Sequence, residues 1–147
     1  AIQNSQTGEI KSIDFPKEQP FPFKPEDLAL VRDAMVAVTL PGGTAARAAA
    51  GAPYTFGGKT GTAQVKSIKQ GEKYNEKTVE ERYRDHALFI AYAPANDPTI
   101  AIGMIVENGG HGGSTAAPIA RQVLDYHLLG KVPASQIEEA AVEEEHD

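Results

Sequence analysis

The apolar positions of this chain change their spacing several times along the sequence. Between residues 25 and 40 they recur at helical spacing, at Leu28, Val31, Met35 and Val38. This spacing predicts a helix that begins at Pro25 and ends near Leu40, because Pro41-Gly42-Gly43 cannot continue it. We expect the apolar stripe of this helix to lie in the core.

Two later stretches, His86 to Ala93 and Thr99 to Glu107, are continuously apolar rather than periodic. Runs of this length predict strands that are buried on both faces. The five residues between them are too few for a crossover helix, so the two strands should form an antiparallel hairpin. Helical spacing returns after Ser114, a good N-cap, and continues to about Leu129, where Gly130 follows.

A further strand is predicted around residues 59–65, where hydroxyl and small residues alternate and Thr60, Thr62 and Val65 are β-branched. The order is then helix, strand, hairpin and helix, which predicts an α+β fold with an antiparallel sheet flanked by helices. We expect this domain to span residues 25–130. Residues 1–24, rich in proline and phenylalanine, should form a loop on the domain surface, and the acidic residues 131–147 a disordered tail.

The composition of the chain excludes several classes of function. A formal net charge of −6 and a pI near 5.2 argue against a nucleic-acid partner. The chain has no cysteine, no apolar run of 18 residues and no leader pattern, so no residue predicts a disulfide, a membrane span or secretion. It begins with Ala1 instead of Met, and we expect it to be part of a longer protein.

The sharpest local motif is Gly57-Gly58-Lys59-Thr60-Gly61-Thr62. A phosphate-binding P-loop would need glycine where Pro53 stands and a helix directly after the motif. Residues 62–68 show no helical period, so this interpretation is disfavoured. Lys-Thr-Gly also occurs in serine acyl-transferases, beside a Ser-x-x-Lys motif and a Ser-x-Asn motif.

The residue types suit that chemistry. A strand edge can offer the cation of Lys59 and the hydroxyls of Thr60 and Thr62 to a carboxylate, and a backbone N–H to an oxyanion. Gly61 has no Cβ to obstruct a substrate that lies against the backbone. The histidines lack metal-ligand spacing; we expect no metal site, a structural hydrogen bond for His86, and an ordinary loop position for His111.

Five segments together resemble the class B penicillin-binding proteins, whose elongation-specific members are peptidoglycan D,D-transpeptidases. In family order they are Gly43-Thr44-Ala45, Gly57 to Val65, Glu81 to Ala87, Ala91 to Pro94 and Glu107 to Gly110. The resemblance runs from about residue 25 to about residue 130. It implies an enzyme that cross-links stem peptides through a serine acyl-enzyme and that β-lactams acylate.

For single residues, the resemblance implies that Lys59 controls the electrostatics of the active site. Thr60, Gly61 and Thr62 would bind the substrate with Lys59, and the N–H of Thr62 would supply half of the oxyanion hole. No serine of this chain fits Ser-x-x-Lys or Ser-x-Asn, so the nucleophile must lie elsewhere in the parent and the chain alone should be inactive. A serine β-lactamase and a β-lactam-sensing receptor domain remain alternatives.

The resemblance also implies a location and partners. The catalytic domain would lie on the periplasmic face of the inner membrane and act in cell-wall synthesis and cell shape. Its ligands would be peptidoglycan stem peptides and β-lactams, without a cofactor. Its protein partners would be the rest of the transpeptidase domain, an inner-membrane glycan polymerase and the elongation complex.

Overall fold

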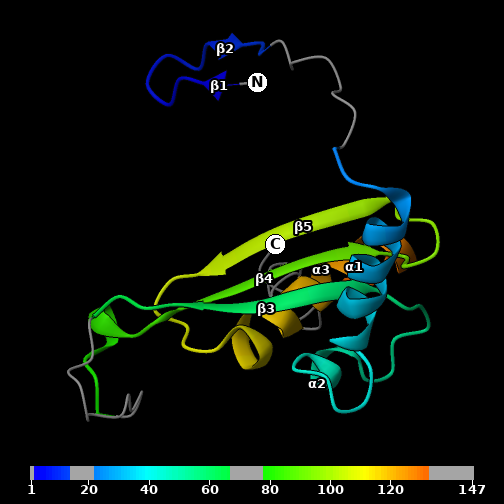
Figure 1. Ribbon diagram of the computed structural model, residues 1–147. Coiled ribbons are helices and arrows are strands. Elements are labelled where there is room, and N and C mark those ends of the chain that lie inside the picture. The colour runs from blue at the N-terminus through cyan, green and yellow to red at the C-terminus, as the bar shows by residue number, and fades with distance from the viewer. Residues whose placement is uncertain (1, 14–21, 67–77, 133–147) are drawn as a thin grey trace, which may run out of the picture.

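The computed structural model describes residues 2–13, 22–66 and 78–132. Its central element is a three-stranded antiparallel sheet of order β3-β4-β5, made of Gly57–Ala63, His86–Ala93 and Ile100–Val106 (Figure 1). The expected hairpin is therefore confirmed, and so is the strand over the Lys-Thr-Gly motif. Thr60 pairs with Phe89 and Thr62 with Ala87, which fixes the register of the motif in the sheet.

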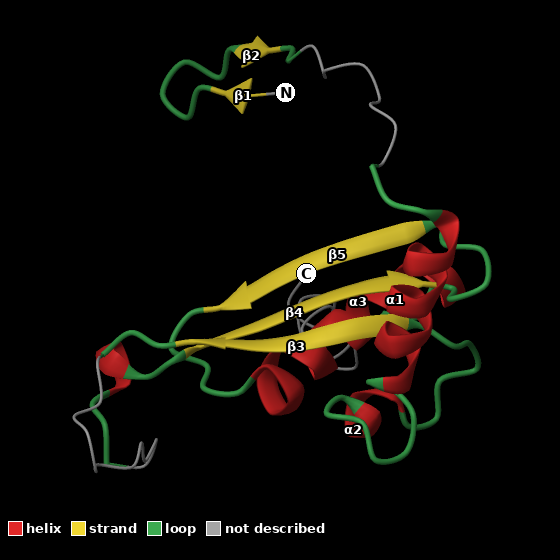
Figure 2. Cartoon of the chain, viewed as in Figure 1, coloured by secondary structure: helices red, strands yellow, loops and turns green. Residues whose placement is uncertain are grey.

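Helices lie beside this sheet, as the α+β prediction requires (Figure 2). α1 (Pro25–Ala37) contacts β3, and α3 (Ala117–Leu129) packs against β4 and β5. α2 (Ala46–Ala49) is a short helix in contact with α3. α1 ends three residues before the position expected from the sequence.

The start of the last helix differs from the prediction. A π-helical turn, η2 (Gly112–Ala116), precedes α3, so Ser114 lies inside a helical turn and is no N-cap. Its hydroxyl donates to the carbonyl of His111. Helical structure begins at Gly112 because that glycine can approach the neighbouring strands more closely than a larger residue. The end of α3 agrees with the prediction, since Gly130 adopts a left-handed conformation with φ of 67°.

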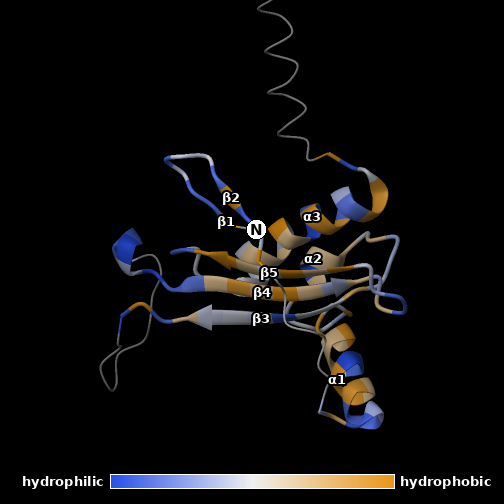
Figure 3. Ribbon diagram, turned by 90° about the horizontal axis from the view of Figure 1, so that it is seen from above, coloured by the Kyte–Doolittle hydropathy of each residue, from blue (hydrophilic) through white to orange (hydrophobic). Residues whose placement is uncertain are grey.

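The core lies on the face of the sheet that α3 covers. Its largest fully buried side chains are Phe56, Phe89 and Leu124. The opposite face is open, since Ile90 of β4 is 52% exposed and Ile105 of β5 is 66% exposed. Figure 3 shows that both strands contain hydrophobic residues. The expectation that β4 and β5 are buried on both faces is therefore wrong. Among the described residues, α1 reaches the other face at Tyr92, whose hydroxyl donates to the Arg32 carbonyl, and leaves Ile90 and Ile105 uncovered.

The apolar stripe of the first helix is likewise less buried than expected. α1 has no fully buried residue, and Val31 is 55% exposed. Leu28, Met35 and Val38 are half-buried. These apolar residues therefore lie at the margin of the core and not inside it. In the described part of the chain, α1 packs mainly against β3.

The amino-terminal residues contain more structure than the predicted loop. β1 (Ile2–Gln3) and β2 (Ile10–Lys11) pair as a short antiparallel hairpin. The side chain of Asn4 accepts hydrogen bonds from the amides of Gln6 and Thr7 and so stabilises the turn. The expected acidic tail lies outside the described residues from 133 onward, and the proposed domain boundaries stay predictions.

η1 (Glu81–Tyr83) is a 3-10 turn that leads into β4. His86, the first residue of β4, has the structural hydrogen bond that the sequence predicted. Its Nδ1 accepts from the backbone amide of Asn108 at 2.9 Å. Asn108 also donates to the Arg84 carbonyl. Together these bonds connect the start of β4 to the turn after β5.

Candidate functional site at the free edge of β3

The Lys-Thr-Gly motif lies on an edge strand. Among the described residues β3 pairs with β4 alone, so its other edge carries backbone groups that can bind a ligand. In an antiparallel pair, alternate residues direct both their N–H and their C=O to the same side. The carbonyls of Phe56 and Thr60 accept from Thr39 and from Lys59 at the outer edge. The same periodicity places the N–H of Thr62 at that edge.

The side chains of the motif divide between the two faces of the sheet, because neighbouring strand residues point in opposite directions. Thr60 and Thr62 share the face that α3 covers. Lys59 lies on the open face, opposite Ile90 in the register. Its ammonium nevertheless returns to the strand edge, where it donates to the carbonyl of Thr60 at 2.6 Å.

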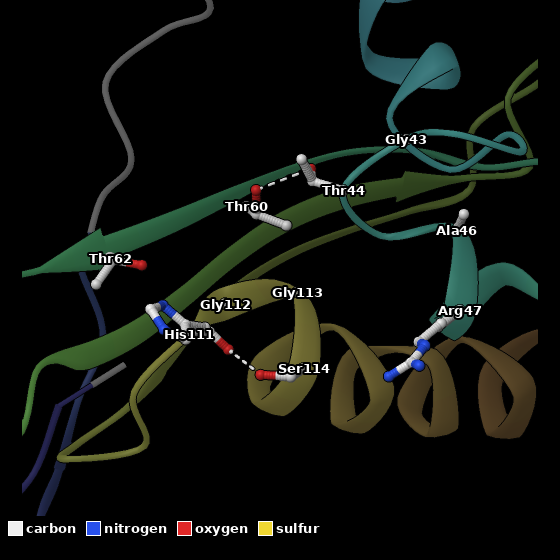
Figure 4. Close-up of a pocket in the computed structure, with 10 residues that line it drawn as sticks. All are labelled: Gly43, Thr44, Ala46, Arg47, Thr60, Thr62, His111, Gly112, Gly113 and Ser114. Atoms are coloured by element: carbon white, nitrogen blue, oxygen red, sulfur yellow. Dashed lines mark hydrogen bonds between the residues drawn. The ribbon is translucent and has the colours of Figure 1, made fainter. Parts of the chain in front are cut away.

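A pocket of about 480 Å³ lies beside this edge, within the size range of small-molecule sites. Of the four predicted site residues, Thr60 and Thr62 line it, whereas Lys59 and Gly61 do not. Figure 4 shows the pocket between β3, the segment that leads into α2, and the turn of η2. The remaining lining residues are Gly43, Thr44, Ala46, Arg47, His111, Gly112, Gly113 and Ser114.

Small residues let these three segments meet. A Cβ on Gly112 would overlap the carbonyl oxygen of Leu88 and lie 2.6 Å from that of Gly61. A Cβ on Gly113 would overlap the carbonyl oxygen of Thr44. The loop before α3 therefore reaches both β3 and the α2 segment only because these two positions lack side chains.

One hydrogen bond connects two walls of the pocket directly. The Oγ1 atoms of Thr44 and Thr60 are 3.0 Å apart (Figure 4). Both hydroxyls can also bind a ligand, and Thr62 adds a third hydroxyl to the lining of the pocket.

Sequence reasoning missed several lining residues. His111 was expected to be an ordinary loop residue, yet it lines the pocket, as do Arg47 and Ser114. The glycines around His111 were the available signal, because they allow a loop to pack closely against a strand. Nothing in the sequence pattern distinguished Arg47, which reaches the pocket from the one-turn helix α2.

A polar network lies behind the pocket and holds the α2 segment to α3. Asp125 accepts from the Tyr54 hydroxyl at 2.6 Å and from Arg121 at 2.8 Å. Arg121 also donates to the carbonyls of Ala48 and Ala50 at the end of α2. The segment that carries Thr44 and Arg47 is thereby anchored to the last helix.

This network changes the acidity of its members. Although partial desolvation acts in the opposite direction, hydrogen bonds from Arg121 and Tyr54 lower the pKa of Asp125. Partial burial, and then the hydrogen bond to Asp125, raise the pKa of Tyr54. Asp125 is therefore held ionised and Tyr54 neutral over the ordinary pH range.

The described residues contain no group of three or more potential metal ligands. Of the helices that the structure describes, none has the length and apolar character needed to cross a bilayer.

Comparisons with known proteins agree on one family. The model of the "penicillin binding protein transpeptidase domain" matches residues 2–125. The peptidoglycan D,D-transpeptidase MrdA of Acinetobacter baumannii is 52% identical over 104 residues, which cover 71% of this chain and 15% of that protein. The chain thus spans under a fifth of the length of this curated relative.

Solved structures give the same result. A crystal structure of Pseudomonas aeruginosa PBP2 in complex with WCK 5153 is 40% identical, with a TM-score of 0.59, over 76% of this chain and 22% of that one. A complex between PBP2 and MreC from Helicobacter pylori contains a chain that is 30% identical, with a TM-score of 0.58, over 78% of this chain and 21% of that one.

Proposed function

Because the chain belongs to the penicillin-binding protein transpeptidase family, we propose that it is part of a peptidoglycan D,D-transpeptidase. The complete enzyme acylates a serine with the end of one stem peptide and transfers the acyl group to an amine of another. Residues 25–130 supply the Lys-Thr-Gly strand and the elements that support it. β-Lactams acylate the same serine.

The observation that supports this function most directly is the pair of threonines at the free edge of β3, both of which line the pocket. In our proposal the hydroxyls of Thr60 and Thr62 bind the carboxylate of the donor peptide or of the β-lactam. The N–H of Thr62 donates to the oxyanion that forms when the serine attacks. Such a donor contributes about 3 kcal/mol to transition-state stabilisation.

Lys59 and Gly61 have different roles in this proposal. The ammonium of Lys59 is held at the strand edge by the Thr60 carbonyl. There it places a positive charge beside the reacting groups and stabilises the negative charge that develops on them. Gly61 allows the ligand to lie along the strand without meeting a Cβ. Neither residue lines the pocket that Thr60 and Thr62 line.

The nucleophile comes from another part of the enzyme. No serine in the 147 residues is followed by lysine at the spacing of Ser-x-x-Lys, the motif that accompanies Lys-Thr-Gly. Catalysis therefore requires the rest of the transpeptidase domain.

We also propose a setting for the whole enzyme. The relative from Helicobacter pylori forms a complex with MreC, and this supports action within a cell-elongation complex at the periplasmic face of the inner membrane. A glycan polymerase that supplies the strands to be cross-linked is the second expected partner.

Fluorescent penicillin labelling tests the proposal. The label should attach to a complete domain that contains this chain and should not attach to the chain alone. Lys59→Ala in the complete domain should slow acylation by about 100-fold, because a charge at the reacting centre is lost. Lys24→Ala, an exposed lysine at the start of α1, is the matched control and should label normally.

Two outcomes would contradict the proposal. Normal labelling of Lys59→Ala would contradict the proposed role of the Lys59 charge in acylation. Rapid turnover of nitrocefin by the complete domain would indicate a β-lactamase, because a transpeptidase deacylates slowly.

A further inference from the structure

We propose that Arg47 determines the preference of this site for ligands with a free carboxylate, by placing its guanidinium against the anionic group that Thr60 and Thr62 hold. This inference rests on the proposed function and extends it to a residue outside the Lys-Thr-Gly motif. Arg47 reaches the pocket from α2, on the wall opposite the turn that carries His111 (Figure 4).

The position of Lys59 leaves a place for another cation. Lys59 lies on the open face of the sheet, and its ammonium is bound to the Thr60 carbonyl. The threonine hydroxyls lie on the opposite face, and there the pocket is lined by Arg47 and contains no carboxylate among its lining residues. An anion bound to the two hydroxyls therefore lies in a pocket that Arg47 lines and Lys59 does not.

The charge of Arg47 is not committed to another group. Within residues 2–13, 22–66 and 78–132 its side chain makes no hydrogen bond or ion pair. Two other arginines differ: Arg82 pairs with Glu80 at 2.9 Å, and Arg121 pairs with Asp125 at 2.8 Å. A guanidinium without a carboxylate partner at the rim of a pocket is suited to a carboxylate ligand, which it can bind through two parallel hydrogen bonds.

The backbone that carries Arg47 is held in place. Arg121 donates to the carbonyls of Ala48 and Ala50, and Thr44 bonds to Thr60. α2 is therefore fixed at both ends, once to α3 and once to β3. The Cα of Arg47 keeps a constant position relative to the threonine pair, which a residue needs if it is to discriminate between ligands.

The test compares two ligands that differ only at the carboxylate group. Acylation rates of the complete domain are measured with benzylpenicillin and with its methyl ester, and the ratio of the two rates reports recognition of the carboxylate. Arg47→Gln should lower this ratio by about 10-fold, which corresponds to about 1.4 kcal/mol, because the charge-assisted hydrogen bonds are lost. Arg47→Lys should give an intermediate ratio, since lysine keeps the charge without the planar fork.

The ratio separates recognition from a structural effect. If Arg47 only supported the fold, its replacement would slow both ligands by the same factor, and the ratio would stay at the wild-type value. Arg82→Gln is the matched control, because Arg82 is exposed and lies outside the pocket; its ratio should equal that of the wild type.

The result also distinguishes this inference from the proposed function. If the wild-type domain is not acylated by benzylpenicillin, the proposed function fails. If it is acylated and the ratio is unchanged in both Arg47 variants, the proposed function stands and the role of Arg47 is overturned.

Discussion

The hydroxyl oxygens of Thr44 and Thr60 lie 3.0 Å apart and join the segment before α2 to the free edge of β3. The two residues are 16 positions apart in the sequence. Thr60 belongs to β3, whereas Thr44 lies in the segment before α2. Their bond closes one corner of the candidate pocket. It also orients the Thr60 hydroxyl. That hydroxyl can still bind a ligand, because a hydroxyl has one donor and two acceptor positions.

Replacing Thr44 by valine tests this relationship. Thr44→Val keeps the shape of the side chain but removes the hydroxyl, so stability should fall by about 1 kcal/mol, the net value of one hydrogen bond. Acylation of the complete domain by benzylpenicillin should slow several-fold, because Thr60 loses the group that orients it. Urea unfolding and acylation kinetics measure the two effects. Thr99→Val, outside the pocket, should change neither; an unchanged Thr44→Val would show that the bond has no role.

A methyl group at Gly112 should disturb the junction of the pocket with the sheet. The new Cβ in Gly112→Ala would overlap the Leu88 carbonyl, and the clash involves backbone that cannot rotate away. We expect a loss of about 3 kcal/mol, at the upper end of overpacking costs. Gly103→Ala is the control, because a Cβ there meets nothing within 4 Å. Equal stability of both variants in urea unfolding would contradict the close approach.

The network around Asp125 should give the stability a defined dependence on pH. The pKa of Asp125 is lowered in the folded state, so its contribution is complete above the pKa of a free aspartate, about 3.9. It is lost as the pH falls through the lowered value. At pH 7, Asp125→Asn should cost about 1–2 kcal/mol, because hydrogen bonds from Arg121 and Tyr54 are weakened. The difference from the wild type should shrink below about pH 4.

Urea unfolding of both proteins between pH 3 and pH 7 measures this effect. A difference that stays constant over the whole range would mean that Asp125 titrates alike in the folded and unfolded states. Arg82→Gln serves as the control, since Arg82 is 70% exposed in its pair with Glu80 and such surface pairs contribute little.

The local elements could be predicted because their causes are local. Proline at the start of α1, glycine after α3 and the five-residue linker between β4 and β5 each limit the backbone near their own position. The boundaries of β4 were correct to the residue. One exception was the start of the last helix, where Ser114 has the right chemistry for an N-cap but Gly112 contacts two strands, and this contact decides where the helical turn begins.

Burial could not be predicted with the same success. A continuous apolar run indicates that a strand can be covered on both faces, but what covers it depends on distant parts of the chain. α3 covers one face of the sheet and leaves Ile90 and Ile105 exposed on the other. The apolar stripe of α1 shows the same limit, since spacing identifies a face and says nothing of the depth at which it packs.

The sequence by itself determined the order of the main helices and strands from Pro25 onward, the strand that carries Lys59, Thr60 and Thr62, and the family to which these motifs belong. The tertiary structure alone decided which side chains meet at the pocket. It separated Lys59 from the two threonines by the alternation of the strand and brought Arg47 and His111 to the threonine side. The reason is physical: a motif of adjacent residues fixes the chemistry that is available, whereas a pocket is formed by segments whose separation in the sequence carries no information about their distance in space.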